Sequence, residues 1–245
     1  MIKRKKSKIT DSSSIDRPFE QRSVGGSIII LSFFILLNIF LTVSCLPRSP
    51  RIILPAEINN LGGEATFYVR SPEREGRSRL GFYFELPDRV RLEIFNPFGG
   101  LESLLWLNGR QAILYIPKEK VFWRGESRWI TADFLGGEME ASELVGVFSA
   151  RWSVFTPDDG WEVFRDEEGR VLGGKKGGLK FEIKETFPGT EMPKTVYFEA
   201  ENFKVRVRLL KLRFNQRWKE NFFTPSFPAG TKQLSWGEIS ELWKR

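Results

Sequence analysis

Between Gly63 and Phe214, apolar and polar residues alternate along a series of short runs. In one run Val90, Leu92 and Ile94 share a face, while charged residues occupy the other face. A period of two is typical of β-strands that bury one side and expose the other. Turn signals such as Asn108-Gly109 separate roughly eleven runs of this kind. The sequence therefore predicts a mainly β domain built on one large, mostly antiparallel sheet.

Two features interrupt this alternation. The last long run, 203–214, changes phase between Leu209 and Leu210, and a β-bulge at that point would restore a single inward face. Segments 140–149 and 235–244 instead show helical spacing of apolar residues. Ser235 and Glu238 have the spacing of a capping box, so we expect a helix near the C-terminus.

A sheet with one apolar face needs something to cover that face. The cover is a second sheet, closure into a barrel, or helices. We expect a curved sheet that forms a half-barrel closed by the short helices. The inward rows mix bulky side chains with small ones such as Ala65, Ser103 and Ala112. This mixture fits either a packed core or an aromatic-lined cavity.

Composition removes several chemistries. The chain has 245 residues, no histidine and one cysteine, which excludes Ser-His-Asp catalysis, histidine metal sites and an intramolecular disulfide. Segment 169–176 nearly matches a phosphate-binding loop, but a strand pattern follows where that loop needs a helix. The acidic runs 158–159 and 166–168 lie beside glycines, as solvated turns do. We expect no cofactor, no metal site and no enzymatic activity, with carboxylate-only chemistry left open.

Positive charge is concentrated near the N-terminus. Residues 1–44 carry +4 of the net charge of +7, so the basic balance is weak support for nucleic-acid binding, and we expect no nucleic-acid partner. The long strand 203–214 also predicts an outward basic row: Lys204, Arg206, Arg208, Lys211 and Arg213. This row fits anionic lipid headgroups, an acidic partner or an ordinary solvated sheet face.

An uncharged, apolar segment spans residues 27–44 and follows a basic region. At about 1.5 Å per residue, a helix of this length just crosses a bilayer. The combination is typical of a signal peptide, or of a membrane anchor with its N-terminus in the cytoplasm. We therefore expect residues 1–44 to be a signal peptide or anchor, followed by a tether at 45–62 and a single domain at 63–245.

The segment Leu41-Thr42-Val43-Ser44-Cys45 resembles the lipobox of bacterial lipoproteins. That resemblance implies cleavage before Cys45 and attachment of a diacylglyceryl group to its thiol. Thr42 departs from the pattern, because Leu, Ile or Val is usual there. Leu46 is not the aspartate that favours inner-membrane retention in enteric bacteria, so outer-membrane delivery is permitted. The alternative is an uncleaved helix at 27–44 that anchors the chain in the inner membrane.

The stretch from Arg91 to Leu104, RLEIFNPFGGLESL, resembles the strand–turn–strand of LolB-type outer-membrane lipoproteins. The wider order of lipobox, strands, hairpin and short helix is similar over about residues 65–214. The resemblance implies a LolA/LolB-like half-barrel that accepts acylated lipoproteins in an apolar cavity. It also implies that Phe98, at the hairpin tip, enters the membrane. The tail beyond Phe214 is absent from the LolB-type proteins of enteric bacteria. Its sequence predicts a short link followed by a closing helix.

These patterns assign roles to particular side chains. Lipidation is expected at Cys45, and membrane insertion at Phe98. The predicted lid residues are Leu144 and Phe148. The predicted cavity wall consists of Leu80, Phe82, Phe84, Leu92, Ile94, Leu105 and Leu114.

We expect a monomer in the cell envelope, on the outer membrane and facing the periplasm. Its expected partners are membrane lipid, acylated lipoprotein cargo and a periplasmic carrier. The alternative function is an envelope-assembly or scaffold lipoprotein with a packed core that binds a protein partner.

Overall fold

A computed structural model of the chain describes residues 52–72 and 74–243. The predicted signal peptide or anchor at 1–44 and the predicted lipidation site Cys45 lie outside these residues. Across the two described ranges, no helix is both long enough and apolar enough to cross a membrane. The described residues all belong to one compact unit.

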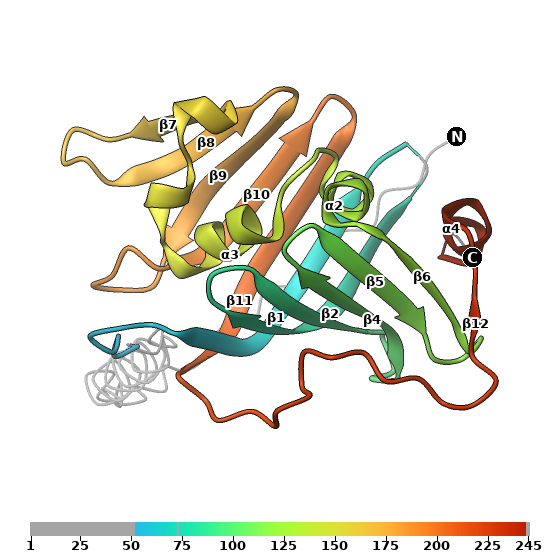
Figure 1. Cartoon of the computed structure of the whole chain (residues 1–245). Helices are drawn as coiled ribbons and strands as arrows, with labels where there is room; N and C mark the ends of the chain where they lie inside the picture. The colour runs from blue at the N-terminus through green and yellow to red at the C-terminus, as the bar shows by residue number, and fades with distance from the viewer. Residues whose placement is uncertain (1–51, 73, 244–245) are drawn as a thin grey trace, which may run out of the picture. The chain divides into compact units, whose positions relative to one another are not determined.

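The described strands form one twelve-stranded sheet that stays open at both edges (Figure 1). Its order is β12-β6-β5-β4-β3-β2-β1-β11-β10-β9-β8-β7, and every neighbouring pair is antiparallel except β12 with β6. The strands are β1 (Asn60–Arg70), β2 (Glu75–Glu85), β3 (Arg89–Phe95), β4 (Leu101–Asn108), β5 (Gln111–Ile116), β6 (Val121–Glu126), β7 (Glu162–Arg165), β8 (Val171–Lys176), β9 (Leu179–Thr186), β10 (Pro193–Ala200), β11 (Phe203–Phe214) and β12 (Lys232–Gln233). The predicted fold class, a mainly β chain with a curved antiparallel sheet, is confirmed.

The pairing of β1 with β11 contains the predicted bulge. Glu64 pairs with Lys211 and Ala65 with Leu209, so Leu210 has no partner on β1. Leu209 is buried on the inner face, whereas Leu210 is left 42% exposed. The extra residue thus returns the strand to a single inward phase after the sequence pattern changes.

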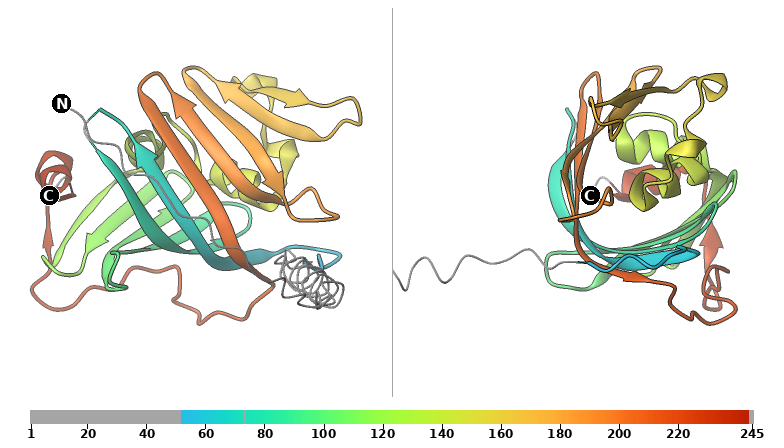
Figure 2. Two further views of the ribbon diagram at one scale, coloured as in Figure 1. Left: turned by 180° about the vertical axis from the view of Figure 1, so that it is seen from behind. Right: turned by 90° about the vertical axis from the view of Figure 1, so that its left-hand side faces the viewer.

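Two helices lie against the concave face of the sheet, which curves around them (Figure 2). They are α2 (Ser127–Leu135) and α3 (Ala141–Ser149), and the 3₁₀ turns η1 (Trp152–Val154) and η2 (Pro157–Asp159) come next in the chain. The helix predicted at 140–149 is confirmed as α3, and a capping box between Glu140 and Glu143 starts it.

The sequence pattern did not predict α2. Its N-cap residue, Glu126, makes no side-chain capping bond, and β-branched Ile130 and Thr131 lie inside it. Both features weaken a helical signal. The available signals were the i,i+4 pair Ile130 and Phe134 and the left-handed Gly136 that ends the helix.

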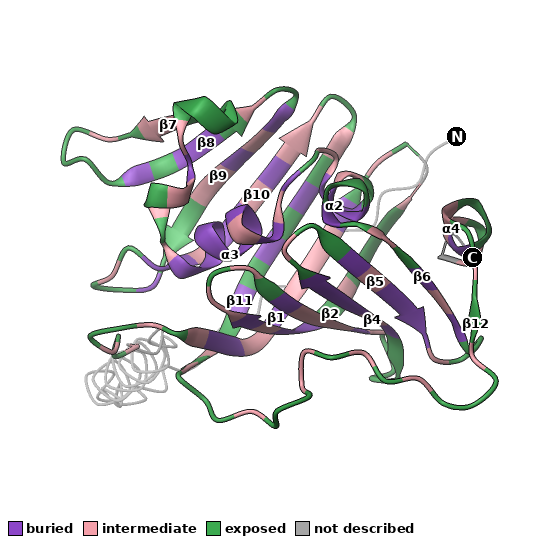
Figure 3. Cartoon of the chain, in the orientation of Figure 1, coloured by how far each residue is buried: buried purple, intermediate pink, exposed green. Residues whose placement is uncertain are grey.

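The core lies between the inner face of the sheet and the two helices (Figure 3). Phe82 and Leu114 from the sheet are buried, as are Ile130 from α2 and Val147 from α3. The first strand begins at Asn60, before the predicted domain start at residue 63. Its start is fixed because the Asn60 side chain accepts from the Gln216 amide at 2.8 Å and donates to the Gln216 carbonyl at 3.1 Å.

The C-terminal segment crosses the outer face of the sheet. The Phe222 ring lies 4.9 Å from Tyr83 and 4.2 Å from the Arg91 guanidinium, and Phe227 stacks on Phe122 at 4.4 Å. Burial raises the pKa of Tyr83. These contacts cover an aromatic outer surface that no alternating pattern explained.

After this crossing, β12 pairs with the edge strand β6, and α4 (Trp236–Trp243) packs Trp236 against Trp123 at 4.8 Å. The predicted C-terminal helix is therefore confirmed. Its capping box is also present, because the Ser235 amide donates to the Glu238 carboxylate at 2.8 Å. The carboxylate also accepts from the Ser235 hydroxyl, and these bonds lower the pKa of Glu238.

Gly63 on β1 lies directly against the backbone of β11. A Cβ atom at this position would lie 1.9 Å from the Lys211 carbonyl oxygen. We expect Gly63→Ala to lower the free energy of unfolding by about 2 kcal/mol or more, because backbone must move to relieve the clash. Gly76→Ala in β2 is the matched control, since nothing lies within 4 Å of its added Cβ. Urea unfolding that shows equal stability for the two variants would contradict this account.

Candidate functional site

An apolar cavity of about 50 Å³ lies between the inner face of the sheet and the helices α2 and α3. It draws its lining from strands near the middle of the sheet and from both helices. The lining residues are Phe67, Leu80, Phe82, Phe84, Leu92, Leu105, Leu107, Ile130, Thr131, Phe134, Leu135, Leu144, Phe148, Val207 and Leu209.

Thr131 is the one residue of this lining with a polar side chain, and its hydroxyl is already engaged. The oxygen donates to the Met139 carbonyl at 2.8 Å and accepts from the Met139 amide at 2.9 Å. The same bonds tie the middle of α2 to the segment that leads into α3. The cavity therefore offers a ligand no polar group of its own.

Five of the seven predicted wall residues line this cavity: Leu80, Phe82, Phe84, Leu92 and Leu105. Both predicted lid residues, Leu144 and Phe148, line it as well. Ile94 lines a neighbouring pocket instead, and Leu114 is buried in the core away from the cavity. The acyl-binding role of these residues stays a prediction.

Sequence reasoning missed two parts of the lining. One is the α2 surface, with Ile130, Phe134 and Leu135, because that helix was not predicted. The other is the pair of central strands, where Phe67 on β1 faces Val207 on β11 across the register. Both strands were predicted to have apolar inner faces, but their pairing joins residues 140 positions apart. No local pattern reports such a long-range neighbour.

A second pocket, of about 170 Å³, opens next to the cavity near the ends of β1, β2 and β3. The two share Phe67, Leu80, Leu92 and Phe134 as lining. Charged side chains, Arg74, Glu75 and Glu102, are also part of the lining of this second pocket. The Arg74 guanidinium lies 5.7 Å from the centre of the Phe134 ring. We call this pocket the mouth, because it adjoins the apolar cavity and has exposed charged side chains in its lining.

Phe98 lies on the β3–β4 turn, which continues from β3 just beyond Ile94 of this mouth. Its side chain is 97% exposed. Asn96 holds the turn, because its Oδ1 atom accepts from the amides of Phe98 at 3.0 Å and Gly100 at 2.9 Å. The ring does not fold back on the sheet, and its entry into a membrane stays a prediction.

A buried carboxylate fastens α3 to the strand β8. Glu143 Oε1 accepts from Trp161 Nε1 at 2.6 Å and from Lys176 Nζ at 2.7 Å, while Oε2 accepts from the Glu140 amide at 2.7 Å. The Glu143 side chain is only 6% exposed. We call Glu143, Trp161 and Lys176 the latch. Lys176 belongs to the near-match to a phosphate-binding loop, which the structure shows as the β7–β8 hairpin, as the strand pattern after it indicated.

The acidic runs are ordinary turn residues. Asp166 accepts from Arg170 Nε at 2.7 Å and from the Arg170 amide at 2.8 Å across the β7–β8 turn. Asp159 accepts from the Thr156 hydroxyl at 2.6 Å. Among the described residues, no three acidic or cysteine side chains cluster in a way that could hold a metal ion.

Comparison with known proteins gives distant likenesses in structure alone. No protein-family model matches the chain, and no curated protein matches it in sequence. It is similar to a DUF1329 family protein from Desulfovibrio piger, with 14% identity, 69% of this chain and 90% of that chain covered, and a TM-score of 0.45.

Two further structures show a likeness of the same low degree. A putative outer membrane lipoprotein-sorting protein domain from Vibrio parahaemolyticus has 11% identity, covers 78% of this chain and 93% of its own, and has a TM-score of 0.45. A LolA superfamily protein from Nitrosomonas europaea has 11% identity, 71% and 93% coverage, and a TM-score of 0.42. Membership of a family does not follow from likenesses this distant, and the LolB-type assignment stays a prediction.

Removing the cation of the latch should loosen α3. Lys176→Met leaves the buried Glu143 carboxylate without its ion pair, so we expect a loss of about 2 kcal/mol in unfolding free energy. The rate of amide hydrogen exchange should increase in α3, and this increase should be larger than the increase in β10. Lys175→Met is the control, because Lys175 is exposed on the same strand. Equal exchange of α3 in the two variants would show that the latch does not hold the helix.

Proposed function

We propose that this protein binds acyl chains in the cavity beneath α2 and α3, and that it accepts lipoproteins or lipids for the outer membrane. The observation that carries the proposal is a lining that is apolar except for the hydrogen-bonded Thr131 and that adjoins the mouth at the end of three strands. Burial of a chain there is favoured by about 0.8 kcal/mol per CH₂ group. This is binding and transfer, and it uses no covalent chemistry and no cofactor.

The size of the cavity determines what binding requires. An engineered cavity of about 150 Å³ holds one benzene molecule, and this one is about 50 Å³. An acyl chain therefore enters only if the helices move away from the sheet. We propose that the structure is the closed form, in which α3 and α2 fill the space that a chain would take.

Phe98 fits the delivery step. It is a large apolar side chain held in water by a rigid turn, and such a group favours an apolar or membrane environment. The turn directly follows β3, and Ile94 near the end of β3 lines the mouth. We propose that Phe98 enters the outer membrane beside the mouth while the cargo leaves the cavity.

Attachment to the membrane is inferred from the N-terminal sequence. We propose a lipid anchor on Cys45 that holds the chain on the outer membrane, facing the periplasm. The alternative anchor is the apolar segment 27–44 in the inner membrane. Either anchor places the described domain next to a bilayer.

The small cavity also supports a second candidate function. If the helices do not move, the core is filled, and the protein is an envelope-assembly or scaffold lipoprotein that binds a protein partner. The two functions differ in one measurable property, which is uptake of an apolar ligand.

Native mass spectrometry of residues 46–245, exported to the periplasm without the lipid anchor, tests acyl binding. We expect a bound acylated species, and we expect Leu92→Glu to weaken its binding at least about tenfold by placing a charge in the lining. Leu172→Glu is the control, because Leu172 is 46% exposed on β8 and outside the cavity. If the protein has only its ligand-free mass, and this mass does not change when lipid is added, the proposal is overturned and the scaffold function is favoured.

Transfer to a membrane tests the role of Phe98. We expect Phe98→Ser to bind a fluorescent fatty acid normally but to release it to vesicles roughly 30-fold more slowly, because a phenyl ring favours the apolar phase by about 2 kcal/mol. Trp129→Ser is the matched control, since Trp129 is an exposed aromatic residue on α2. Stopped-flow transfer at an unchanged rate in Phe98→Ser would exclude this role.

A further inference from the structure

An exposed surface with apolar and basic side chains lies at the opposite end of the strands from the mouth. Ile53, which is 91% exposed, lines an open groove together with Leu210 and Arg213. Arg213 also lines the adjoining pocket, together with Arg217. We call Ile53, Leu210, Arg213 and Arg217 the tether-end patch, because the described chain begins beside it at Ile52.

Most of the basic row on β11 is neutralised by neighbouring strands. Lys204 pairs with Glu199 at 3.3 Å, and Arg208 approaches Glu185 at 4.0 Å. Lys211 pairs with Glu64 at 2.7 Å, and this hydrogen bond holds the pKa of Glu64 below its usual value. Over most of its length, then, the row is an ordinary solvated sheet face.

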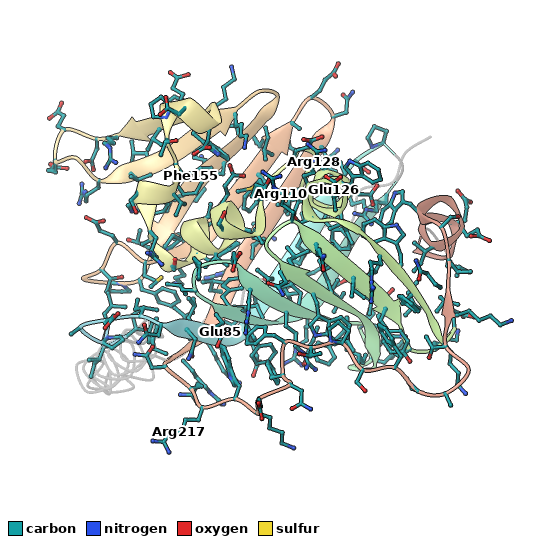
Figure 4. The ribbon with its side chains drawn as sticks, in the orientation of Figure 1. Glu85, Arg110, Glu126, Arg128, Phe155 and Arg217 are labelled. Carbon is teal, nitrogen blue, oxygen red and sulfur yellow. The ribbon has the colours of Figure 1, made fainter. Side chains whose placement is uncertain are left out.

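Arg206, between the paired Lys204 and Arg208, has no described ion pair and lies 5.5 Å from the centre of the Tyr68 ring. At the tether end of the row, two arginines without an ion pair line one pocket. No described carboxylate lies within ion-pair distance of Arg213 or Arg217, and both residues are exposed. Figure 4 shows the Arg217 side chain directed away from the sheet. The rest of the pocket lining includes Tyr83 and Trp218 and the ion pair of Glu64 with Lys211, which adds no net charge. The positive charge of the outer face is thus left available beside exposed apolar side chains.

The short chain between the expected anchor and Ile52 limits how far the patch can lie from a bilayer. Ile52 follows Cys45 by seven residues and follows the apolar segment 27–44 by eight. An extended chain of that length spans at most about 25–30 Å. Whichever anchor the protein uses, the patch is held within that distance of a bilayer, whereas a protein partner has no such constraint.

We propose that the tether-end patch docks on the surface of a bilayer that contains anionic phospholipid. Arg213 and Arg217 contact the headgroup phosphates, and Ile53 and Leu210 enter the boundary between headgroups and acyl chains. Docking holds the anchored domain with the mouth and Phe98 directed away from the membrane that carries the anchor. It is therefore a resting orientation, distinct from the one in which Phe98 enters a membrane. The inference rests on an N-terminal anchor and not on the cavity, so failure of acyl binding would leave it standing.

A fluorescent label on the full chain measures this docking. The variant Leu210→Cys with Cys45→Ser carries an environment-sensitive fluorophore at position 210 and keeps the segment 27–44 as its anchor. It is reconstituted in vesicles of phosphatidylcholine, with or without phosphatidylglycerol, and the vesicle-bound fraction is isolated by flotation. We expect a blue shift and protection from iodide in the anionic vesicles only. The same label at Leu172→Cys, also with Cys45→Ser, is the control and should stay in water.

Charge removal then identifies the contact. We expect Arg213→Gln with Arg217→Gln to lower the ratio of docked to undocked protein about 30-fold, at about one kcal/mol for each basic residue near an anionic surface. Lys118→Gln with Arg124→Gln removes two exposed charges elsewhere and should change nothing. High salt should also release the label, because exposed charges are screened within about 3 Å at 1 M.

Three results would overturn the proposal. The first is a label at position 210 that iodide reaches equally in both kinds of vesicle. The second is docking that survives the loss of Arg213 and Arg217 but is lost in Phe98→Ser, which would place the opposite end of the strands on the membrane. The third is a full chain that does not float with anionic vesicles.

Discussion

An open sheet with one apolar face needs a cover, and the rest of this structure depends on how the cover is made. Twelve strands curve around α2 and α3 in place of a second sheet. Helices pack against a sheet through a few side chains each, so they can leave the sheet without breaking a strand pair. The cover is therefore the part of the fold that the proposed acyl binding requires to move, and the cavity lies directly beneath it.

The latch shows how such a cover is kept in place. Glu143 is a charge in an apolar setting, and that is tolerable because both of its oxygens accept hydrogen bonds. One oxygen belongs to the capping box that starts α3, and the other is bound by Lys176 of β8 and by Trp161. The Glu143 side chain thus both caps the start of α3 and attaches this helix to the sheet. Movement of α3 as a rigid body keeps the first set of bonds and breaks the second.

Much of this fold was predictable because its signals are local. Alternation indicated most strands, the phase change at Leu209 and Leu210 indicated the bulge, and the spacing of Ser235 and Glu238 indicated α4. The features that were not predicted depend on contacts between distant residues or have only a weak local sequence signal. The helix α2 lacks a capping bond, and the latch joins residues 33 positions apart. Most of the predicted wall surrounds the cavity, whereas Leu114 does not, since an inward-facing row says nothing about where helices leave a gap.

The position of β1 has a consequence for how the chain acquires its structure. This strand is nearly the first to emerge, yet it pairs with β11, the last long strand. Until the chain is complete to Phe214, one side of β1 is an unpaired edge in the middle of the future sheet, and the aromatic outer face awaits the segment beyond it. The two parts of the sheet, β1–β6 and β7–β11, are joined where β1 pairs with β11. A chain shortened before Phe214 would therefore leave an open strand edge in the middle of its sheet, and such an edge is a template for pairing with another chain.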